Sequence, residues 1–465
     1  MRLRATITRH QPVVNNALPV GSSYGDSTVK ISVIGCGYLG AVHASAMAEL
    51  GHEVVGIDVD PAKIEALSNG RTPFFEPGLP EVLTSAMASG RLRFSTDIAD
   101  AAGAAVHFVA VGTPQKKGSY AADLTYVDAA VDALLPHLSA GDLIVGKSTV
   151  PVGTAARLAA VVAASGRGAA LAWNPEFLRE GFAVQDTIAP DRLVYGVPAG
   201  EAGERAVAQL NEVYASAIAT QTPLVVTDYA TAELVKVAAN AFLATKISFI
   251  NAMAEIAEVS GADVTQLADA IGYDTRIGRR FLNAGVGFGG GCLPKDIRAF
   301  TARAEELGRG ESVAFLKEVD SINLRRRQRV VDLTVAALDR PVYNAKVAVL
   351  GLSFKPHSDD VRDSPALDVA VQLRGLGANV VATDPQAIEN SRARHPQLSY
   401  ETDIETTLRG ASAVVLVTEW PEFKDIDPVW AATLVETPTI VDGRNTLDAV
   451  KWRAAGWTYY GLGRP

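Results

Sequence analysis

The sequence predicts an α/β protein with two doubly wound, parallel-sheet domains joined by a long central helical segment. In the first half of the chain, short apolar runs alternate with helical patterns, which is typical of a parallel sheet with helices on both faces. A single helical pattern then extends over residues 228–259. A second α/β alternation begins at residue 346.

The first predicted strand leads into a glycine-rich turn. A mostly β-branched run over residues 29–34 is followed by Gly35, Gly37 and Gly40 in the segment VIGCGYLG, and then by helix-forming residues. The second strand ends at Asp58, 23 positions after Gly35. Strand, glycine turn, helix, strand and acid make up the dinucleotide-binding fingerprint of a Rossmann domain, in which the pyrophosphate lies at a helix N-terminus and the acid binds the ribose hydroxyls.

The acid at the end of the second strand also selects the cofactor. Asp58 favours NAD over NADP because the 2′-phosphate of NADP would face a like charge. Tyr38 and Leu39 complete the loop expected to contact NAD. Lys63 either reaches the adenosine side of the cofactor or is a solvated helix charge.

Later elements extend this sheet and then change in character. The expected elements are strands at residues 106–111, 143–148 and 170–173 and helices at residues 126–138 and 154–164. From residue 228, apolar positions such as Leu234, Ala238 and Phe242 recur at helical spacing. Helical character resumes over residues 297–338, with a break around residues 307–311. We place the first domain at residues 29–215 and the central domain at residues 216–340.

The last part of the chain, residues 341–465, repeats the pattern of the first. The segment LGANVVATD, which ends at Asp384, parallels LGHEVVGID, which ends at Asp58. The fingerprint itself is lost, since Gly351 is not followed by GxxG and the acid comes 33 positions later. The inserted loop carries Lys355 and Arg362, which are either phosphate contacts or solvated loop charges. We infer a second nucleotide, attached to the substrate.

Composition narrows the class of protein. A formal net charge of −9 gives no support to nucleic-acid binding. The two cysteines, Cys36 and Cys292, cannot form a disulfide framework, so a reducing compartment, the cytoplasm, is expected. The histidines show no metal-ligand spacing, and no metal is implied. Cys36 is expected to be a small packing residue.

Two segments bear on location. The apolar stretch 238–257 is interrupted by Lys246 and Glu255, so no membrane span is expected. Residues 1–28 have no apolar segment of the secretory kind and are expected to form a disordered tail.

Cys292 lies in the segment GFGGGCLPKD, after a run of glycines and shortly before Lys295 and Asp296. Residues without Cβ let backbone and substrate approach a small nucleophile, and a neighbouring cation lowers the pKa of a thiol. The alternative is a buried structural cysteine beside a turn. The nucleotide-binding loop in the same chain favours the nucleophile.

Seven motifs in a characteristic order cover nearly everything after residue 28. They are VIGCGYLG (33–40), VGTP (111–114), KSTVP (147–151), NPEFLREG (174–181), KVAANAFLATKISFINAMAE (236–255), DTRIGRRFLNAGVGFGGGCLPKD (274–296), and GLSFKP with DDVRDSP (351–365). In these motifs the chain resembles the UDP-glucose/GDP-mannose dehydrogenase family. One departure is Gly291, where many relatives carry serine.

The resemblance implies an NAD-dependent enzyme that oxidises UDP-glucose at C6 to UDP-glucuronate, a four-electron reaction. It implies that Cys292 attacks the intermediate aldehyde to give a thiohemiacetal, whose oxidation gives a thioester. GDP-mannose or another nucleotide sugar is the alternative substrate. A two-electron dehydrogenase would need no cysteine here, and an NAD-sensing or structural protein would need neither Cys292 nor Lys236.

Roles for further residues follow from the same resemblance. Lys236 and Asn240, four apart on one helix, are expected to stabilise oxyanion charge. Asp296 and Thr149 are expected to hold a water or assist proton transfer. Glu176 and Glu180 line the sugar and nicotinamide, and which of them is the acid or base stays open. Further NAD contacts are expected at Thr113, Thr149, Glu180, Lys295 and Arg362. Substrate contacts are expected at Glu176, Phe177, Leu178, Arg179, Glu180, Lys236, Asn240, Arg276, Phe281, Leu282, Asn283, Ala284, Gly285, Gly289 and Lys355.

The resemblance also implies an assembly. Arg276 is expected to reach the substrate of a neighbouring subunit, so we expect a homodimer built on the long central helix.

Overall fold

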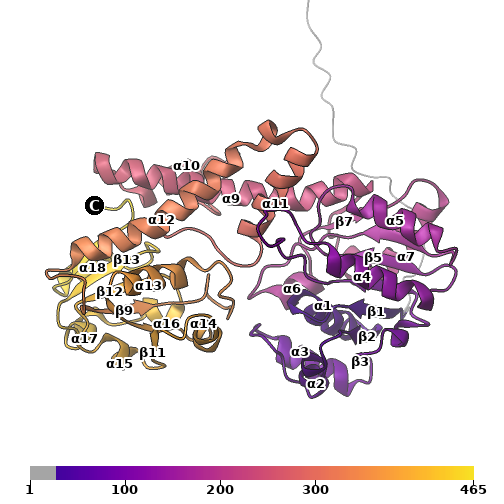
Figure 1. The fold of residues 1–465 in the computed structure, drawn as a ribbon, viewed down its shortest axis with the longest axis horizontal. Coiled ribbons are helices and arrows are strands. Elements are labelled where there is room, and N and C mark those ends of the chain that lie inside the picture. Colours follow the sequence, from indigo (N-terminus) through magenta and orange to yellow (C-terminus); the bar gives the residue numbers. More distant parts are fainter. Residues whose placement is uncertain (1–27) are drawn as a thin grey trace, which may run out of the picture.

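The computed structural model describes residues 28–465, arranged in two lobes connected by long helices (Figure 1). The N-terminal lobe, in indigo to purple, and the C-terminal lobe, in orange to yellow, each contain a parallel sheet with helices on both faces. The predicted fold class is confirmed. The expected disordered tail, residues 1–28, lies outside the described residues except for Thr28.

The N-terminal domain is built on an eight-stranded sheet in the order β3-β2-β1-β4-β5-β6-β7-β8, parallel except between β6 and β7. Its strands are β1 (Lys30–Ile34), β2 (Glu53–Ile57), β3 (Leu92–Ser95), β4 (Val106–Val109), β5 (Leu143–Gly146), β6 (Ala170–Trp173), β7 (Leu193–Gly196) and β8 (Leu224–Thr227). Its helices are α1 (Tyr38–Glu49), α2 (Pro61–Ser68), α3 (Leu79–Ala88), η1 (Ile98–Ala101), α4 (Thr125–Leu134), η2 (Leu135–His137), α5 (Thr154–Ala164), α6 (Ala183–Ile188), α7 (Glu201–Val213) and α8 (Ala215–Ala219).

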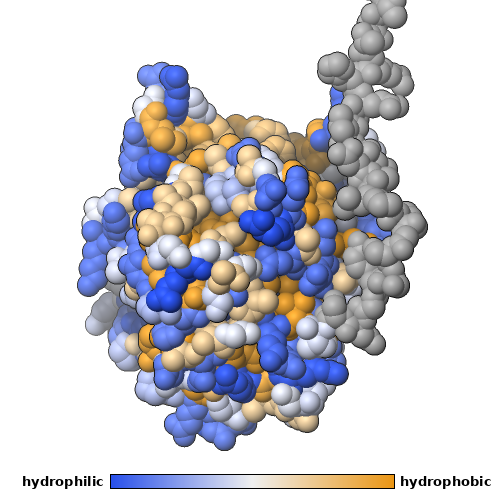
Figure 2. Space-filling model, turned by 90° about the vertical axis from the view of Figure 1, so that its right-hand side faces the viewer, coloured by the Kyte–Doolittle hydropathy of each residue, from blue (hydrophilic) through white to orange (hydrophobic). Residues whose placement is uncertain are grey.

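The central strands of this sheet are buried on both faces, which is why they read as continuous apolar runs. Adjacent residues of β1 enter different cores: Val33 packs with Phe108 and Val145, and Ile34 packs with Val109 on the opposite face. The outer helix surfaces face solvent, and Figure 2 shows hydrophilic and hydrophobic side chains interspersed over this end of the molecule.

The boundary of the first domain differs from the predicted one. Residues 215 and 216 both lie in α8, and the chain then forms β8, which pairs with β7 and completes the sheet. The first domain therefore extends to Thr227. A short edge strand after a helix gives too weak an apolar signal to be seen in the sequence.

The central domain is helical, as predicted. It contains α9 (Tyr229–Ser260), α10 (Val264–Gly272), α11 (Leu293–Glu306), η3 (Gly310–Val313) and α12 (Phe315–Ala337). The expected break around residues 307–311 separates α11 from η3. By length and composition α9 would suffice to cross a membrane. In the structure it packs against α11 and α12, and Ala241 and Ala244 share a small apolar core with Leu316.

The C-terminal domain has a six-stranded, all-parallel sheet in the order β11-β10-β9-β12-β13-β14. Its strands are β9 (Lys346–Leu350), β10 (Asn379–Thr383), β11 (Ser399–Tyr400), β12 (Ala413–Leu416), β13 (Thr439–Asp442) and β14 (Thr458–Gly461). Its helices are α13 (Pro365–Gly375), α14 (Ile388–Arg394), α15 (Ile404–Leu408), α16 (Pro421–Lys424), α17 (Pro428–Ala432) and α18 (Ala449–Ala454). The strand order repeats that of β3 to β6 in the first sheet, as the sequence repeat predicts.

The acid of the second repeat keeps one contact of Asp58 and adds others. Asp384 follows β10, and its Oδ2 accepts the backbone N–H of Leu352 at 2.8 Å, just as Asp58 Oδ2 accepts that of Cys36. The same oxygen of Asp384 also accepts the backbone N–H of Ser353 at 3.0 Å and the indole N–H of Trp420 at 3.1 Å. The acid is therefore hydrogen-bonded to the loops that follow β9 and β12 of its own domain.

Candidate active site

The glycine loop after β1 has the form needed to hold a pyrophosphate. A Cβ at Gly40 would lie 1.8 Å from the carbonyl oxygen of Gly35, so this close approach of helix to turn requires glycine. An added Cβ at Gly37 would meet no atom within 4 Å, so the space above the loop is open. No side chain of the described residues caps the N-terminus of α1, and its backbone N–H groups can bind a phosphate.

Asp58 stands beside this loop at the carboxyl end of β2. Its Oδ2 accepts the backbone N–H of Cys36 at 2.8 Å and pairs with Lys63 Nζ at 2.8 Å. Lys63 thus pairs with the acid, and its contact with the adenosine side stays a prediction. Cys36 is fully buried, as expected of a packing residue. The loop, the open helix end and the acid fit a dinucleotide.

Cys292 is the N-cap residue of α11 and its side chain is solvent-exposed. Desolvation by the surrounding protein raises the pKa of the Cys292 thiol, and the charges of Asp296 and Glu180 raise it further. Lys236 and Lys295 lower it, as expected of neighbouring cations, but their effect is outweighed. The pKa of the thiol is therefore raised overall.

A polar chain connects Asp296 to the N-terminal domain. Asn240 Nδ2 donates to Asp296 Oδ2 at 2.7 Å, and Lys295 Nζ pairs with Asp296 Oδ1 at 2.7 Å. Lys295 Nζ also lies 3.4 Å from Thr113 Oγ1, which donates to the carbonyl of Thr149 at 2.8 Å. Five predicted site residues from α9, α11 and two sheet loops thus meet in one place.

Lys236 lies one turn before Asn240 on α9. Its Nζ is 5.5 Å from the centre of the Phe177 ring, and the guanidinium of Arg192 lies 3.8 Å from the centre of the same ring. Phe177 belongs to the segment NPEFLREG, so this loop is held against the helix that carries Lys236.

The loop 174–181 is fixed at both ends within the N-terminal domain. At its start, Glu176 Oε2 pairs with Lys147 Nζ at 3.0 Å. At its end, the carboxylate of Glu76, which is buried, accepts the backbone N–H groups of Gly181 at 2.6 Å and Ala183 at 2.7 Å. Arg179 forms a bidentate pair with Asp186 and is turned toward it.

Glu180 connects the same loop to the C-terminal domain. Its Oε2 accepts from Ser358 Oγ at 3.2 Å, its Oε1 lies 3.5 Å from Arg362 Nη2, and Lys355 Nζ donates to its carbonyl at 2.6 Å. Burial raises the pKa of Glu180 to about 7, and the neighbouring Asp360 adds to this, whereas Arg362, Lys355 and Ser358 oppose it. Lys355 and Arg362, predicted as ligand contacts, here hold the two domains together.

The glycine run before Cys292 lets the active-site loop press against the C-terminal domain. A Cβ at Gly289 would lie 2.3 Å from the carbonyl oxygen of Asp363. A Cβ at Gly291 would lie 2.4 Å from the guanidinium carbon of Arg362, so a serine at this position would displace the Arg362 side chain. The glycines therefore serve domain contact in addition to the predicted access to the thiol.

The segment 281–285, predicted to run beside the sugar, has two kinds of side chain. Leu282 and Ala284 are buried in an apolar cluster of the central domain, so only their backbone is available to a ligand. Phe281 and Asn283 are exposed. The N–H of Gly285 donates to Asn251 Oδ1 at 2.9 Å. Arg276 is exposed to solvent, with Asp274 as its ion-pair partner.

Sequence reasoning missed several groups that build this site. They are Lys147, Asn174, Tyr214, Glu76 and Ser358. Lys147 gave a usable signal, because a lysine that directly follows the apolar run of β5 must be buried or must mark the carboxyl edge of the sheet. Glu76 gave none, since its backbone partners, Gly181 and Ala183, are more than 100 residues away. Among residues 28–465 there is no cluster of metal-ligating side chains.

Family models match the chain in three consecutive parts. They describe the NAD binding domain of the UDP-glucose/GDP-mannose dehydrogenase family at residues 29–218, its central domain at residues 230–325 and its UDP binding domain at residues 348–449. These parts agree with the three domains of the structure.

Individual UDP-glucose dehydrogenases are similar to this chain over almost its whole length. UDP-glucose 6-dehydrogenase TuaD of Bacillus subtilis is 42% identical, with 94% of this chain and 93% of the relative covered. UDP-glucose 6-dehydrogenase of Rhizobium meliloti is 41% identical, with 94% and 100% covered. A UDP-glucose dehydrogenase structure from Pyrobaculum islandicum superposes with a TM-score of 0.86 at 39% identity, covering 96% of this chain and 100% of that one.

Proposed function

The chain belongs to the UDP-glucose/GDP-mannose dehydrogenase family, and from this premise we propose that it oxidises UDP-glucose at C6 to UDP-glucuronate with NAD. One observation carries the proposal. The thiol of Cys292 is within electrostatic reach of Glu180 from the N-terminal domain, Lys236 from the central domain and Arg362 from the C-terminal domain. A site assembled from a dinucleotide-binding domain and a second nucleotide-binding fold around one nucleophile suits a nucleotide sugar.

NAD is the cofactor of this family's N-terminal domain, and it supplies the hydride acceptor for both oxidations. The loop from Gly35 to Gly40 and the N-terminus of α1 would hold its pyrophosphate, and Asp58 would bind its ribose. Thr113 lies beside Lys295, and Arg362 lies against Gly291, next to Cys292.

The thiol of Cys292 accounts for a four-electron outcome at one site. After the first oxidation has turned the C6 alcohol into an aldehyde, the sulfur adds to the carbonyl carbon and the carbonyl oxygen takes a proton, which gives a thiohemiacetal. Loss of a hydride and a proton from this adduct leaves a thioester. Water then adds to the thioester carbon, the C–S bond breaks, the sulfur regains its proton and the carboxylate is released.

The surrounding groups stabilise charge at these steps. The ammonium of Lys236 and the amide of Asn240 offer donors to the oxygen that becomes negative when sulfur or water adds. Asn240 is oriented by Asp296, and this carboxylate with Thr149 serves a water or a proton transfer. Glu176 and Glu180 both remain candidates for the acid or base: the first is paired with Lys147, and the second has a pKa of about 7.

The protein acts as a homodimer through α9, in the cytoplasm. Support comes from a row of exposed apolar side chains along this helix: Leu234, Phe242, Phe249 and Ile256 recur at intervals of seven or eight residues and form one stripe. Arg276, which is exposed on its own chain, would reach the substrate of the second copy.

A substrate panel tests the proposal. UDP-glucose, GDP-mannose and UDP-N-acetylmannosamine are each offered with NAD, and NADH and uronate are measured when limiting sugar is exhausted. We expect turnover with UDP-glucose and two NADH per uronate. A ratio of one would overturn the thioester route, and faster turnover of GDP-mannose would favour the alternative substrate. Sedimentation of the wild type and Phe242→Arg tests the dimer, which the arginine is expected to dissociate.

A further inference from the structure

We propose that Lys147 is a positioning residue for the second half of the reaction, because it holds the carboxylate of Glu176 in place. The inference deepens the proposed function and rests on it. Lys147 directly follows β5, and Asn174 directly follows the neighbouring β6, so both lie at the carboxyl edge of the parallel sheet, where open α/β sheets bind their ligands.

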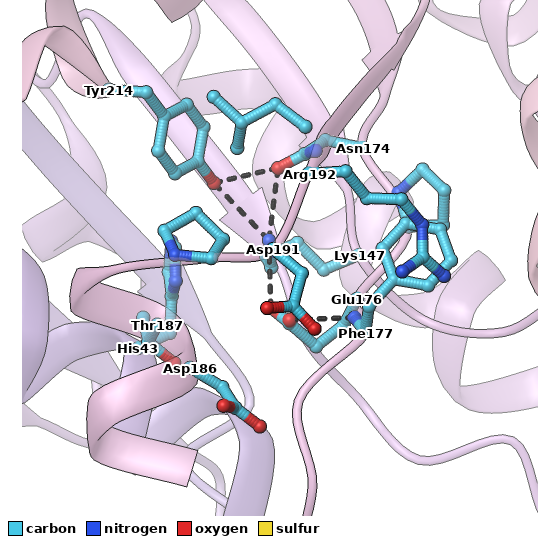
Figure 3. A pocket seen from close by; sticks show the side chains of 13 residues that line it. His43, Lys147, Asn174, Glu176, Phe177, Asp186, Thr187, Asp191, Arg192 and Tyr214 are labelled. Carbon is cyan, nitrogen blue, oxygen red and sulfur yellow. Dashed lines mark hydrogen bonds and ion pairs between the residues drawn. The ribbon is translucent and has the colours of Figure 1, made fainter. Parts of the chain in front are cut away.

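Lys147 is nearly inaccessible, with a side chain 4% exposed. Figure 3 shows its Nζ at the centre of a cluster: it lies 2.9 Å from Asn174 Oδ1, 3.2 Å from the hydroxyl of Tyr214 and 3.0 Å from Glu176 Oε2. The hydroxyl of Tyr214 in turn donates to Asn174 Oδ1 at 2.7 Å, and Asn174 Nδ2 donates to the carbonyl of Val194 at 3.0 Å. The ammonium is thus held by side chains whose own positions are set by further hydrogen bonds.

The other side of the pair is the catalytic loop. Glu176 Oε1 accepts the backbone N–H groups of Phe177 at 2.8 Å and Leu178 at 3.0 Å. Both oxygens of the carboxylate are therefore held, one by Lys147 and one by the loop backbone. Because the Phe177 ring lies under Lys236, the position of Glu176 also sets the surface against which that lysine rests.

The charges around the cluster show which group compensates the buried charge of Lys147. Burying an ammonium costs several kcal/mol unless an anion compensates it, and Glu176 is the carboxylate that pairs with Lys147 among the described residues. His43, which lines the same cavity of about 30 Å³, supplies no charge, since burial and Lys147 hold its pKa well below the usual value. Asn174 and Tyr214 are neutral donors and acceptors.

A buried ion pair adds little to the net stability of a protein, because removing both charges from water costs about as much as their attraction gains. Its effect on Glu176 is geometric: the fixed ammonium holds Oε2 of the carboxylate while the loop backbone holds Oε1. A carboxylate oriented in this way can take the proton of the water that attacks the thioester. Without Lys147, the carboxylate would lose one of its two holds and the loop would lose its anchor at the start.

The test compares Lys147→Met with Tyr214→Phe in the full-length enzyme. The methionine removes the cation at nearly constant volume, whereas the phenylalanine removes a hydroxyl of the same cluster and leaves the pair intact. We measure kcat for uronate formation and KM for UDP-glucose and NAD, with thermal melts of each variant. For Lys147→Met we expect kcat to fall by about two orders of magnitude while both KM values stay within a few-fold of the wild type. For Tyr214→Phe we expect a lower Tm and a much smaller loss of kcat.

A double-mutant cycle separates positioning from general damage. If Lys147 acts through Glu176, Lys147→Met should cost little more in a Glu176→Gln background than Glu176→Gln alone. Lys147→Arg, which keeps the cation, should recover most of the lost kcat. A loss of kcat in Lys147→Arg as large as in Lys147→Met, or additive losses in the cycle, would overturn the proposal. Should the methionine variant fail to accumulate folded, Lys147→Gln gives the same comparison. The NADH-to-uronate ratio of the wild type tests the underlying function independently.

Discussion

The clearest single prediction concerns Asp296→Asn, which should make Cys292 more reactive toward an alkylating agent and the enzyme less active. Asp296 is buried and belongs to the first turn of α11, and its backbone N–H donates to the carbonyl of Cys292 at 2.9 Å. Residues four apart on a helix lie about 6 Å from each other. At an effective dielectric of about 20, two unit charges at that distance repel by about 3 kcal/mol.

Solvent at the exposed thiol reduces this figure to about 1.5 kcal/mol, roughly a tenfold change in the thiolate fraction. A thiolate of lower basicity is also a weaker nucleophile by about half of that logarithmic gain. Alkylation by iodoacetamide at pH 7.5 should therefore be about threefold faster in Asp296→Asn than in the wild type. Over the same change, kcat should fall by about two to four orders of magnitude, because Asn240 loses its carboxylate partner and the proton-handling group is gone.

The matched variant is Lys295→Met, which removes a cation that lowers the pKa of the same thiol. Alkylation should be slower than in the wild type. Slower or unchanged alkylation of Asp296→Asn would refute the electrostatic account of Cys292, whatever happens to kcat.

Three further outcomes are expected. In Asp58→Ala, kcat/KM for NAD should fall and that for NADP rise, because the ribose acceptor is lost and Lys63 is released from its ion pair; an unchanged ratio would place the discriminating acid elsewhere. In Cys292→Ala, calorimetry should find NAD and UDP-glucose binding within a few-fold of the wild type while uronate formation drops by several orders of magnitude; substantial uronate would return Cys292 to a structural role. The pKa of Glu180 is about 7 in the folded protein and about 4.5 in the unfolded chain, so the free energy of unfolding falls by about 3 kcal/mol as pH rises between these values. Glu180→Gln should therefore have a smaller difference in Tm between pH 5 and pH 8 than the wild type. The same difference in both proteins would show that Glu180 is solvated.

Most of the fold could be predicted from local patterns in the sequence. The strands of both sheets are apolar on two faces, so β1, β2 and β4 stand out as runs, and α9 stands out by its spacing. The elements that were misjudged depend on distant partners. β8 is half exposed at a sheet edge and is defined by its pairing with β7, and no pattern within residues 215–228 reveals that partner.

The site residues also fall into two groups: those that local motifs predict and those whose role depends on distant partners. Asn240, Asp296 and Lys295 could be proposed from motifs, and the structure brings them together. The direction of the Cys292 pKa could not, because it depends on the sum of desolvation and of charges from separate domains, of which the sequence showed only the adjacent lysine. Glu76 likewise acts on backbone groups more than 100 residues away, so its role exists only in the folded chain.

The loop 174–181 carries both Glu176 and Glu180, and it is anchored at three places. Lys147 holds its start, Glu76 holds its end, and Glu180 near its end takes three contacts from the C-terminal domain. Moving the C-terminal domain away would break the contacts of Glu180 but leave the pair of Lys147 with Glu176 unchanged, since that pair lies wholly in the N-terminal domain. Opening of the cleft for substrate entry should therefore expose and ionise Glu180 while Glu176 stays in position. Of the two carboxylates left open by the sequence, Glu180 is thus the one whose protonation follows domain closure, and Glu176 is the one that is already oriented before the substrate arrives.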